Sequence, residues 1–290
     1  MKGYAPGCYP RFRCVAGACR HSCCVAWEID IDADTLAYYE SVPGDFGQRL
    51  RENIAEGAFR LDDRERCPFL NGCGLCDIIL TLGEDALSQI CTDHPRYRNF
   101  FTHREETGLG LCCEAAAELI LGETEPFSEV LLWDDGAAEE PTPWEEELLA
   151  VRARLMALAQ EPRPLAERME RVLAAAGARI PERDWRSVFL SLERMDETWA
   201  VRLRGDWHDP PETLEKPLER LLLYLLYRHL PGAADKRGLA ARTAFAVLCC
   251  RVAGALSGDY PALLETARLL SAEIEYSDEN VDILLELLGG

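Results

Sequence analysis

Cysteines are concentrated at the front of this 290-residue chain, where eleven of the thirteen fall within the first 113 residues. The densest run is FRCVAGACRHSCCVAWEIDID, which starts at Phe12. Thiolates at short, irregular spacings can converge on one centre, because the turns between them let several sulfurs point into the same volume. The pattern therefore raises the question of which metal or cluster these residues hold.

A disulfide framework is the alternative to a metal site. Such frameworks suit small secreted domains that bury too little core, whereas this chain is long enough for a hydrophobic interior. Its start, MKGYAPGCYP, has no apolar signal-peptide core. Apolar runs such as residues 221–226 are far shorter than the roughly 20 apolar residues of a membrane helix. We therefore expect a cytoplasmic protein with metal-binding or redox-active thiols and no membrane partner.

The spacing leaves the choice of metal open between an iron–sulfur cluster and zinc. Zinc sites usually bring ligands in CxxC pairs, and only Cys73 with Cys76 makes one. Irregular spacing, the adjacent Cys23 and Cys24, and few histidines favour an iron–sulfur cluster. Thirteen cysteines exceed four ligands, so the surplus could form a second site, a redox pair or buried core. The pair at 249–250 lies in the apolar run AFAVLCCRVAGAL, where small core residues are expected.

Composition divides the chain into three regions. Residues 1–122 form a cysteine-rich metal- or cluster-binding region, and residues 123–142 form a linker rich in proline, glycine and acidic residues. Residues 143–290 form a helical bundle, which is the candidate substrate-recognition region. We therefore expect a mainly α fold, with a loop-containing helical front lobe organised by a metal cluster and a C-terminal bundle.

Apolar residues at three- and four-residue steps predict the rear helices. Pro141 and Pro143 indicate a helix start near Trp144. The predicted rear helices cover residues 143–160, 164–176, 182–204, 212–230, 238–256, 259–272 and 278–288. Shorter front helices are predicted at residues 34–39, 47–55, 84–91 and 111–121. The last of these would place Cys112 and Cys113 in a first turn, where the helix dipole favours thiolate over thiol.

The formal net charge of the chain is −20, and both halves share it. A protein that binds nucleic acid needs a concentrated basic face to neutralise phosphates. The charge therefore argues against a nucleic-acid partner.

Four motifs follow one another in a fixed order: the cysteine run from Phe12, CPFL with GLC, LGEDALSQIC followed by HPRY, and CCEAA. In this order they resemble the flagellin lysine N-methylases, which belong to a wider group named for a CxxCxxCC zinc- or iron-chelating region. The resemblance covers about residues 9–121. The cysteines that match the family pattern are Cys14, Cys19, Cys23, Cys24, Cys67, Cys76, Cys91 and Cys112. The cysteines that do not match are Cys8, Cys73 and Cys113.

The resemblance implies methyl transfer from S-adenosylmethionine to lysine side chains of a protein substrate, flagellin in that family. It also implies a [4Fe–4S] cluster, with zinc as the alternative, and makes the eight matching cysteines the candidate ligands. Two positions depart from the pattern: Cys113 stands where the family usually has Pro, and His94 where it often has Tyr.

Two other function classes stay open. One is a non-catalytic iron–sulfur or zinc module that binds a partner or senses redox state, and the other is an electron-transfer protein.

Lysine methylation requires a neutral amine, so the site should contain a group that takes the proton. Glu28, Asp30 and Tyr38 are the catalytic candidates, and Asp32 and Tyr39 stand beside them in the same segment. The alternative for these residues is a solvated strand or a helix-capping face. Trp27 and Arg96 are candidates for binding the methyl donor. The indole could cover the cluster and exclude water, and a guanidinium matches the carboxylate of the donor's methionine part.

Two familiar donor-binding patterns are incomplete in this sequence. TGLGLCCE offers Gly108 and Gly110, but an isolated GxG is weak and no preceding strand is expected here. The CxxxCxxC pattern of radical S-adenosylmethionine proteins is half met, because Cys19 and Cys23 have the first spacing but Cys24 follows at once. We therefore expect any donor to bind a mainly helical fold by another geometry.

Overall fold

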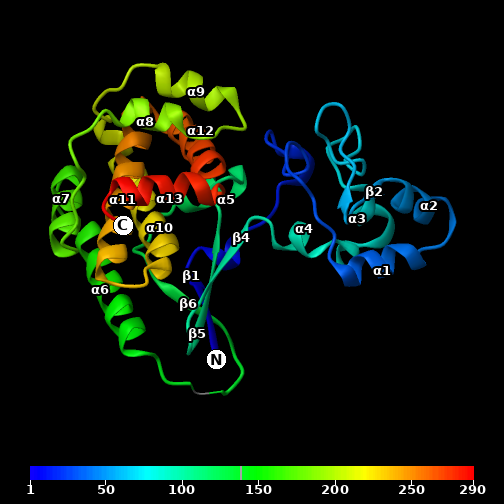
Figure 1. The fold of residues 1–290 in the computed structure, drawn as a ribbon, viewed down its shortest axis with the longest axis horizontal. Helices are drawn as coiled ribbons and strands as arrows, with labels where there is room; N and C mark the ends of the chain where they lie inside the picture. Colours follow the sequence, from blue (N-terminus) through cyan, green and yellow to red (C-terminus); the bar gives the residue numbers. More distant parts are fainter. Residues whose placement is uncertain (138) are drawn as a thin grey trace. The chain divides into compact units, whose positions relative to one another are not determined.

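The protein, seen here as a computed structural model that describes residues 1–137 and 139–290, divides into two compact units (Figure 1). The cysteine unit is Arg13–Tyr97, and the helical unit combines Met1–Phe12 with Arg98–Gly290. These divisions differ from the boundary that composition suggested after residue 122. The first twelve residues join the rear of the chain through strand pairing, which leaves no trace in composition.

The cysteine unit is built from short elements. They are α1 (Ala33–Ser41), α2 (Gly44–Glu52), β2 (Ile54–Ala55), β3 (Ala58–Phe59), α3 (Asp77–Leu82) and α4 (Gln89–Asp93). The helix expected at 84–91 is a 3₁₀ turn, Glu84–Ala86, followed by α4, and α3 was not anticipated. Asp32 begins α1 by accepting a hydrogen bond from the Thr35 N–H, as an N-cap residue does.

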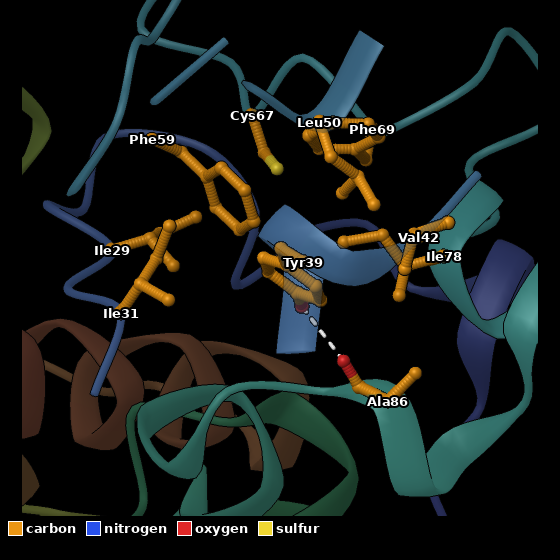
Figure 2. Packing of buried hydrophobic residues seen from close by; sticks show 10 residues of the cluster. All are labelled: Ile29, Ile31, Tyr39, Val42, Leu50, Phe59, Cys67, Phe69, Ile78 and Ala86. Atoms are coloured by element: carbon orange, nitrogen blue, oxygen red, sulfur yellow. Dashed lines mark hydrogen bonds between the residues drawn. The ribbon is translucent and has the colours of Figure 1, made fainter. Parts of the chain in front are cut away.

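The cysteine unit has a small hydrophobic core of its own. Its buried members are Ile29, Ile31, Tyr39, Val42, Leu50, Phe59, Cys67, Phe69, Ile78 and Ala86. Figure 2 shows the Cys67 side chain directed into this core beside the rings of Tyr39 and Phe59. The two rings lie 6.1 Å apart between centroids. So few large side chains give a unit of this size little hydrophobic stabilisation, and a metal centre would add to it.

A four-stranded sheet with the order β4-β5-β1-β6 was not expected from the sequence. Its strands are β1 (Lys2–Pro6), β4 (Arg96–Phe100), β5 (Arg104–Leu109) and β6 (Glu129–Asp134). β1 pairs in parallel with β5, where Lys2 lies opposite Arg104, and antiparallel with β6, where Pro6 lies opposite Glu129. β6 therefore occupies part of the segment 123–142 that was expected to be a linker.

The helical unit follows the predicted helices closely. They are α5 (Glu114–Leu121), α6 (Pro143–Ala159), α7 (Leu165–Ala175), α8 (Trp185–Ser191), α9 (Glu197–Arg204), α10 (Glu215–His229), α11 (Lys236–Ala255), α12 (Tyr260–Leu270) and α13 (Asp278–Leu287). α10 and α11 pack together at the centre of this unit, with α6 and α7 on one side and α5 on the other (Figure 1). Cys249 and Cys250 are fully buried in α11, which confirms their expected place in the core. The mainly helical fold is thus confirmed.

Two predicted helix boundaries have clear local causes. α6 begins at Pro143 with a capping box, in which the Thr142 hydroxyl accepts from the Glu145 N–H and the Glu145 carboxylate accepts from the Thr142 N–H. The single helix expected at 182–204 is broken into α8 and α9. There the buried Glu273 carboxylate accepts hydrogen bonds from the N–H groups of Met195 and Asp196, so tertiary contacts override the helical periodicity.

α11 alone among the described helices is long and apolar enough to cross a membrane, a feature that the sequence analysis did not identify. The apolar stretch of α11 that has this length and composition is 72% buried inside the fold. Burial on this scale is what the core helix of a folded domain shows, and length with composition is weak support for a membrane span.

Candidate metal centre

Four of the family-matching cysteines lie together in the cysteine unit. Cys67 belongs to its buried core, and Cys24, Cys76 and Cys91 pack against the same core. Burial, together with smaller contributions from the thiols of Cys24, Cys91 and Cys76, raises the pKa of the Cys67 thiol to about 12. These mutual effects identify the four sulfurs as neighbours. They come from four separate segments, so a centre bound to them would tie the unit together.

A rigid hairpin places Cys67 and Cys76. Leu70 forms a β-bridge with Cys76, and the Asp77 N–H donates to the Phe69 carbonyl oxygen at 2.8 Å. The Asn71 side chain fills the hairpin, because its oxygen accepts from the N–H groups of Cys73 and Leu75. Two cysteines nine positions apart are thereby brought to one end of the hairpin.

Arg49 of α2 fixes this hairpin to the rest of the cysteine unit. Its guanidinium donates to the Asp77 carboxylate at 2.8 Å and to the Pro68 carbonyl oxygen at 2.6 Å. It also lies 4.9 Å above the centre of the Phe69 ring. The hairpin that carries the two cysteines is therefore held by contacts that do not involve their thiols.

Backbone N–H groups are directed at the sulfurs of the hairpin. The Phe69 N–H hydrogen-bonds the Cys67 thiol, and the N–H groups of Ile78 and Ile79, in the first turn of α3, hydrogen-bond the Cys76 thiol. These bonds lower the pKa of each thiol, while burial, the larger effect, raises it. N–H donors that favour the thiolate form are expected around a thiolate-ligated metal or cluster.

Cys24 is held beside Cys67 by backbone pairing. The Cys67 N–H donates to the Cys24 carbonyl oxygen, and the Ala26 N–H donates to the Glu65 carbonyl oxygen, both at 2.8 Å. A hydrogen bond with Cys23 lowers the pKa of Cys24 to about 7, against the opposing effect of burial. Cys24 is therefore the thiol of this group that ionises most readily near neutral pH.

A second set of cysteines lies on neighbouring outer loops of the same unit. Cys14, Cys23 and Cys73 are exposed, and Cys19 is half-buried. The two loops touch at Gly17, where an added Cβ would lie 2.8 Å from the Cys73 carbonyl oxygen. Only glycine allows this approach. Their exposure places these thiols at or near the surface of the unit, where the Cys23 thiol hydrogen-bonds Cys24 of the core group.

The four core-facing thiols have the chemistry of a metal site but are wider apart than ligands of one ion. Within residues 1–137 and 139–290, no three His, Cys, Asp or Glu side chains lie close enough to ligate a single metal. The set of four sulfurs around one core, two of them facing N–H donors, nevertheless fits the ligand chemistry of an iron–sulfur cluster, and zinc on the same thiols would need them to move closer together. A polynuclear cluster spans more space than a single ion.

Cys112, the eighth matching cysteine, lies in the helical unit. Burial raises its pKa to about 11, and a hydrogen bond with Tyr276 and the charge of Arg228 lower it only in part. Cys113 is the N-cap of α5 and Cys112 precedes it, so the prediction that both lie in the first turn of the helix was wrong, and for Cys112 burial disfavours the thiolate that the helix dipole was expected to favour. The residues that influence the Cys112 thiol are Tyr276, Arg228, Cys113 and Glu275, all in the helical unit.

The predicted catalytic acids lie on the solvent side of the cysteine unit. Glu28 and Asp30 are exposed and alternate with the buried Ile29 and Ile31, as in a half-buried strand, and Asp30 bridges to Ala58. The alternative of a solvated strand therefore describes their local structure. Both carboxylates stay accessible to a substrate.

The other predicted site residues are placed as follows. Tyr38 is 44% exposed on α1, and Trp27 is half-buried. Arg96 donates to the Thr92 carbonyl oxygen at 3.1 Å. Burial lowers the pKa of His94 to about 4, with a further contribution from Arg96, so this imidazole is neutral at pH 7.

Tyr39, not Tyr38, is the tyrosine beside the thiols. It is fully buried, and burial together with the thiols of Cys91 and Cys76 raises its pKa. The sequence contained a signal for this: Leu36, Tyr39 and Val42 recur at three-residue steps, which is the spacing of one helix face. Tyr39 therefore lies on the apolar face of α1, which packs into the core beside the thiols.

The GxG segment has a setting that the sequence did not reveal. Gly108 lies in β5, Gly110 follows the strand, and α5 begins at Glu114, so a strand does precede this turn. At Gly110 an added Cβ would collide with the Tyr276 hydroxyl. A larger residue at this position would have to displace the Tyr276 ring.

A buried polar network in the helical unit was also missed. The Glu275 carboxylate, at the end of the π-helix Ser271–Glu275, accepts from the Tyr224 hydroxyl at 2.9 Å and lies 2.6 Å from Nε2 of His229. The Arg228 guanidinium donates to the same hydroxyl at 2.7 Å. Because these groups satisfy one another, the network can remain buried in the core.

Comparison with known proteins identifies relatives for 42% of the chain. Over 133 residues it is 29% identical to the Lysine-N-methylase of Salmonella typhimurium and 28% identical to that of Salmonella choleraesuis. Over these 133 residues the chain is similar to proteins named Lysine-N-methylase. The resemblance drawn from the cysteine motifs is thus confirmed. The match spans about a third of the length of these two relatives (33% of each).

A third relative carries a flagellar name. The chain is 28% identical over 133 residues to the Flagellar biosynthetic protein FliU of Salmonella muenchen, and the match covers 79% of that protein. No protein-family model and no solved structure matches the sequence.

Proposed function

We propose that this protein is a cytoplasmic enzyme that transfers methyl groups from S-adenosylmethionine to lysine side chains of a protein, with flagellin as its substrate. The observation that carries the proposal is the similarity to two proteins named Lysine-N-methylase. The relative named for flagellar biosynthesis supports a flagellar substrate. The acidic surface of the chain, with a net charge of −20, favours the approach of a lysine-rich partner.

We further propose that the cysteine unit holds a [4Fe–4S] cluster on Cys24, Cys67, Cys76 and Cys91. These are the four thiols that surround one core, and N–H groups already point at two of them. A cluster bound there would link four segments of the unit and supply an electron-accepting centre. Zinc on the same thiols is the alternative that metal analysis distinguishes.

The remaining candidates act on the substrate amine and the donor. Glu28 and Asp30 are two residues apart in one extended segment, so both face away from the core on the same side. A carboxylate there can bind the lysine ammonium and take its proton. The Tyr38 hydroxyl, exposed on α1, is a further acceptor. Trp27 would shield the reacting groups from water, and the Arg96 guanidinium would bind the donor's carboxylate.

Methyl transfer from a sulfonium is a direct displacement by the amine. The protein therefore has to align nitrogen, methyl carbon and sulfur, remove one proton from the ammonium, and exclude water. One methyl group moves to nitrogen and the electron pair of its bond stays on sulfur. No oxidant is needed for this step.

The test is incubation of anaerobically purified protein with S-adenosylmethionine and flagellin from the same cell, followed by mass analysis of the flagellin lysines. We expect added methyl mass on lysines that depends on both the donor and the protein. Absence of that mass, together with no donor binding by calorimetry, would overturn the proposal and leave a non-catalytic metal-binding module.

A further inference from the structure

We propose that Asp32 and Tyr39 of the α1 segment are positioning residues that hold Cys91 in place for metal binding. The inference rests on the proposed metal centre of the cysteine unit. It concerns how one ligand is placed and assigns no contact between either residue and a metal.

Cys91 lies on an element that cannot place it alone. α4 comprises only Gln89–Asp93, and isolated helices this short are unstable in water. Ser88 occupies its N-cap position without a side-chain cap hydrogen bond, so the usual local means of starting a helix is missing. Something outside α4 must therefore fix its first turn.

Asp32 supplies the missing cap from 57 residues away in the sequence. One carboxylate oxygen accepts from the Thr35 N–H at 3.0 Å and so caps α1. The other accepts from the Gln89 N–H, the first residue of α4, at 2.9 Å. These two N–H groups, Gln89 first, lower the pKa of Asp32 to about 2, so the clamp is ionised at neutral pH. One carboxylate thus starts both helices.

Tyr39 holds the other end of the same connection. Its hydroxyl donates to the Ala86 carbonyl oxygen at 2.7 Å, and Figure 2 shows this bond leaving the buried ring. The contacts at Ala86 and Gln89 lie on either side of Ser88 and precede Cys91 by five and two residues. Two bonds from α1 therefore set both the position and the direction of the segment that carries the thiol.

The experiment measures the rate at which iron leaves the loaded full-length protein in the presence of a strong chelator, without oxygen. The variants are Asp32→Asn, whose single oxygen can accept from the Thr35 N–H or the Gln89 N–H but not from both in the native geometry, and Tyr39→Phe, which removes only the hydroxyl. Asp34→Asn and Tyr38→Phe are the matched controls, because Asp34 and Tyr38 are exposed on the same helix. We expect about tenfold faster iron loss in the two test variants and wild-type rates in the controls.

Double variants show whether the effect passes through Cys91. In a Cys91→Ser background, Asp32→Asn should change the rate of iron loss less than twofold. In a Cys24→Ser background, the same Asp32→Asn substitution should accelerate iron loss about tenfold. The visible absorption spectrum of loaded Asp32→Asn protein should shift toward that of Cys91→Ser. A general loss of folding would accelerate iron loss in both backgrounds and leave the loaded spectrum unchanged.

Two results separate this inference from the proposal beneath it. If wild-type protein binds no metal, the proposed centre is wrong and the positioning roles fall with it. If wild-type protein binds metal and Cys91→Ser loses it rapidly, but Asp32→Asn and Tyr39→Phe behave like the controls, the positioning inference alone is wrong.

Discussion

Cys67 and Cys73 offer a matched pair of substitutions in one hairpin. Cys67 is 7% exposed and faces the core thiols, whereas Cys73 is exposed at the hairpin tip. Replacing each by alanine removes one sulfur from the same structure. Only Cys67→Ala should remove a ligand.

The expected free-energy changes differ severalfold. In metal-free protein, Cys67→Ala deletes one buried atom and should destabilise the cysteine unit by about 1 kcal/mol, comparable to a buried methylene group. Metal at a free concentration 1,000 times its dissociation constant stabilises a folded unit by about 4 kcal/mol. Loaded protein should therefore lose about 5 kcal/mol with Cys67→Ala, and less than about 0.5 kcal/mol with Cys73→Ala.

Hydrogen–deuterium exchange of peptides from residues 13–97 reports the opening free energy of the cysteine unit without interference from the helical unit. Each variant is measured after anaerobic iron–sulfur reconstitution and again after removal of metal by a chelator. Equal losses for Cys67→Ala and Cys73→Ala, or a Cys67→Ala effect that is the same with and without metal, would refute this reasoning.

Two further predictions concern the helical unit. Glu106→Gln should destabilise it by about 3 kcal/mol in urea unfolding, the low end of the cost of breaking a buried ion pair, because the buried Arg152 would lose its partner at 2.6 and 2.5 Å and keep only Glu129 at 3.6 Å. A loss below about 1 kcal/mol would contradict the assigned ion pair. Acid should also destabilise this unit. Burial lowers the pKa of His229. Burial raises the pKa of Glu275, but the charge of Arg228 and the hydrogen bond with His229 outweigh it and lower this pKa to about 2. Both groups take up a proton at a higher pH in the unfolded chain than in the folded protein. The free energy of unfolding should therefore decrease as pH falls below about 6.5, because of His229, and again between about 4.5 and 2, because of Glu275. Unfolding curves in urea that do not change between pH 7 and pH 4 would contradict these protonation states.

The rear helices could be predicted because local and tertiary signals agree there. Thr142, Pro143 and Glu145 form a capping box that is visible in the sequence, and α6 starts where it predicts. α10 shows an apolar stripe and is buried along most of its length. The break between α8 and α9 was not predictable, because it depends on Glu273, which lies 77 residues away from Asp196 in the sequence.

The sheet was hidden by its polar composition. β5 reads REETGL, which suggests an exposed segment, yet Glu106 within it is fully buried against Arg152. A hydrophobicity pattern cannot reveal a strand whose buried charge is neutralised by a residue on another element. β1 and β6 are short, and their pairing joins segments more than 120 residues apart that no local pattern connects.

At the candidate site, residue types could be predicted better than positions. The matching cysteines indicated a metal centre, but spacing alone did not separate the core-facing Cys67 and Cys76 from the exposed Cys14 and Cys23. That division follows from which side of each loop faces the core. Tyr39 could have been chosen from the helical spacing of its neighbours, whereas the long-range contact between Asp32 and Gln89 could not.

Iron and acid-labile sulfide, measured per chain on protein purified without oxygen, test most directly the claim that Cys24, Cys67, Cys76 and Cys91 hold a [4Fe–4S] cluster. The account predicts about four iron and four sulfide per chain, with absorbance near 400 nm. It also predicts loss of both elements when any of the four cysteines is replaced by alanine, and their retention in Cys73→Ala. Zinc without sulfide, or full iron and sulfide in all four single variants, would contradict it.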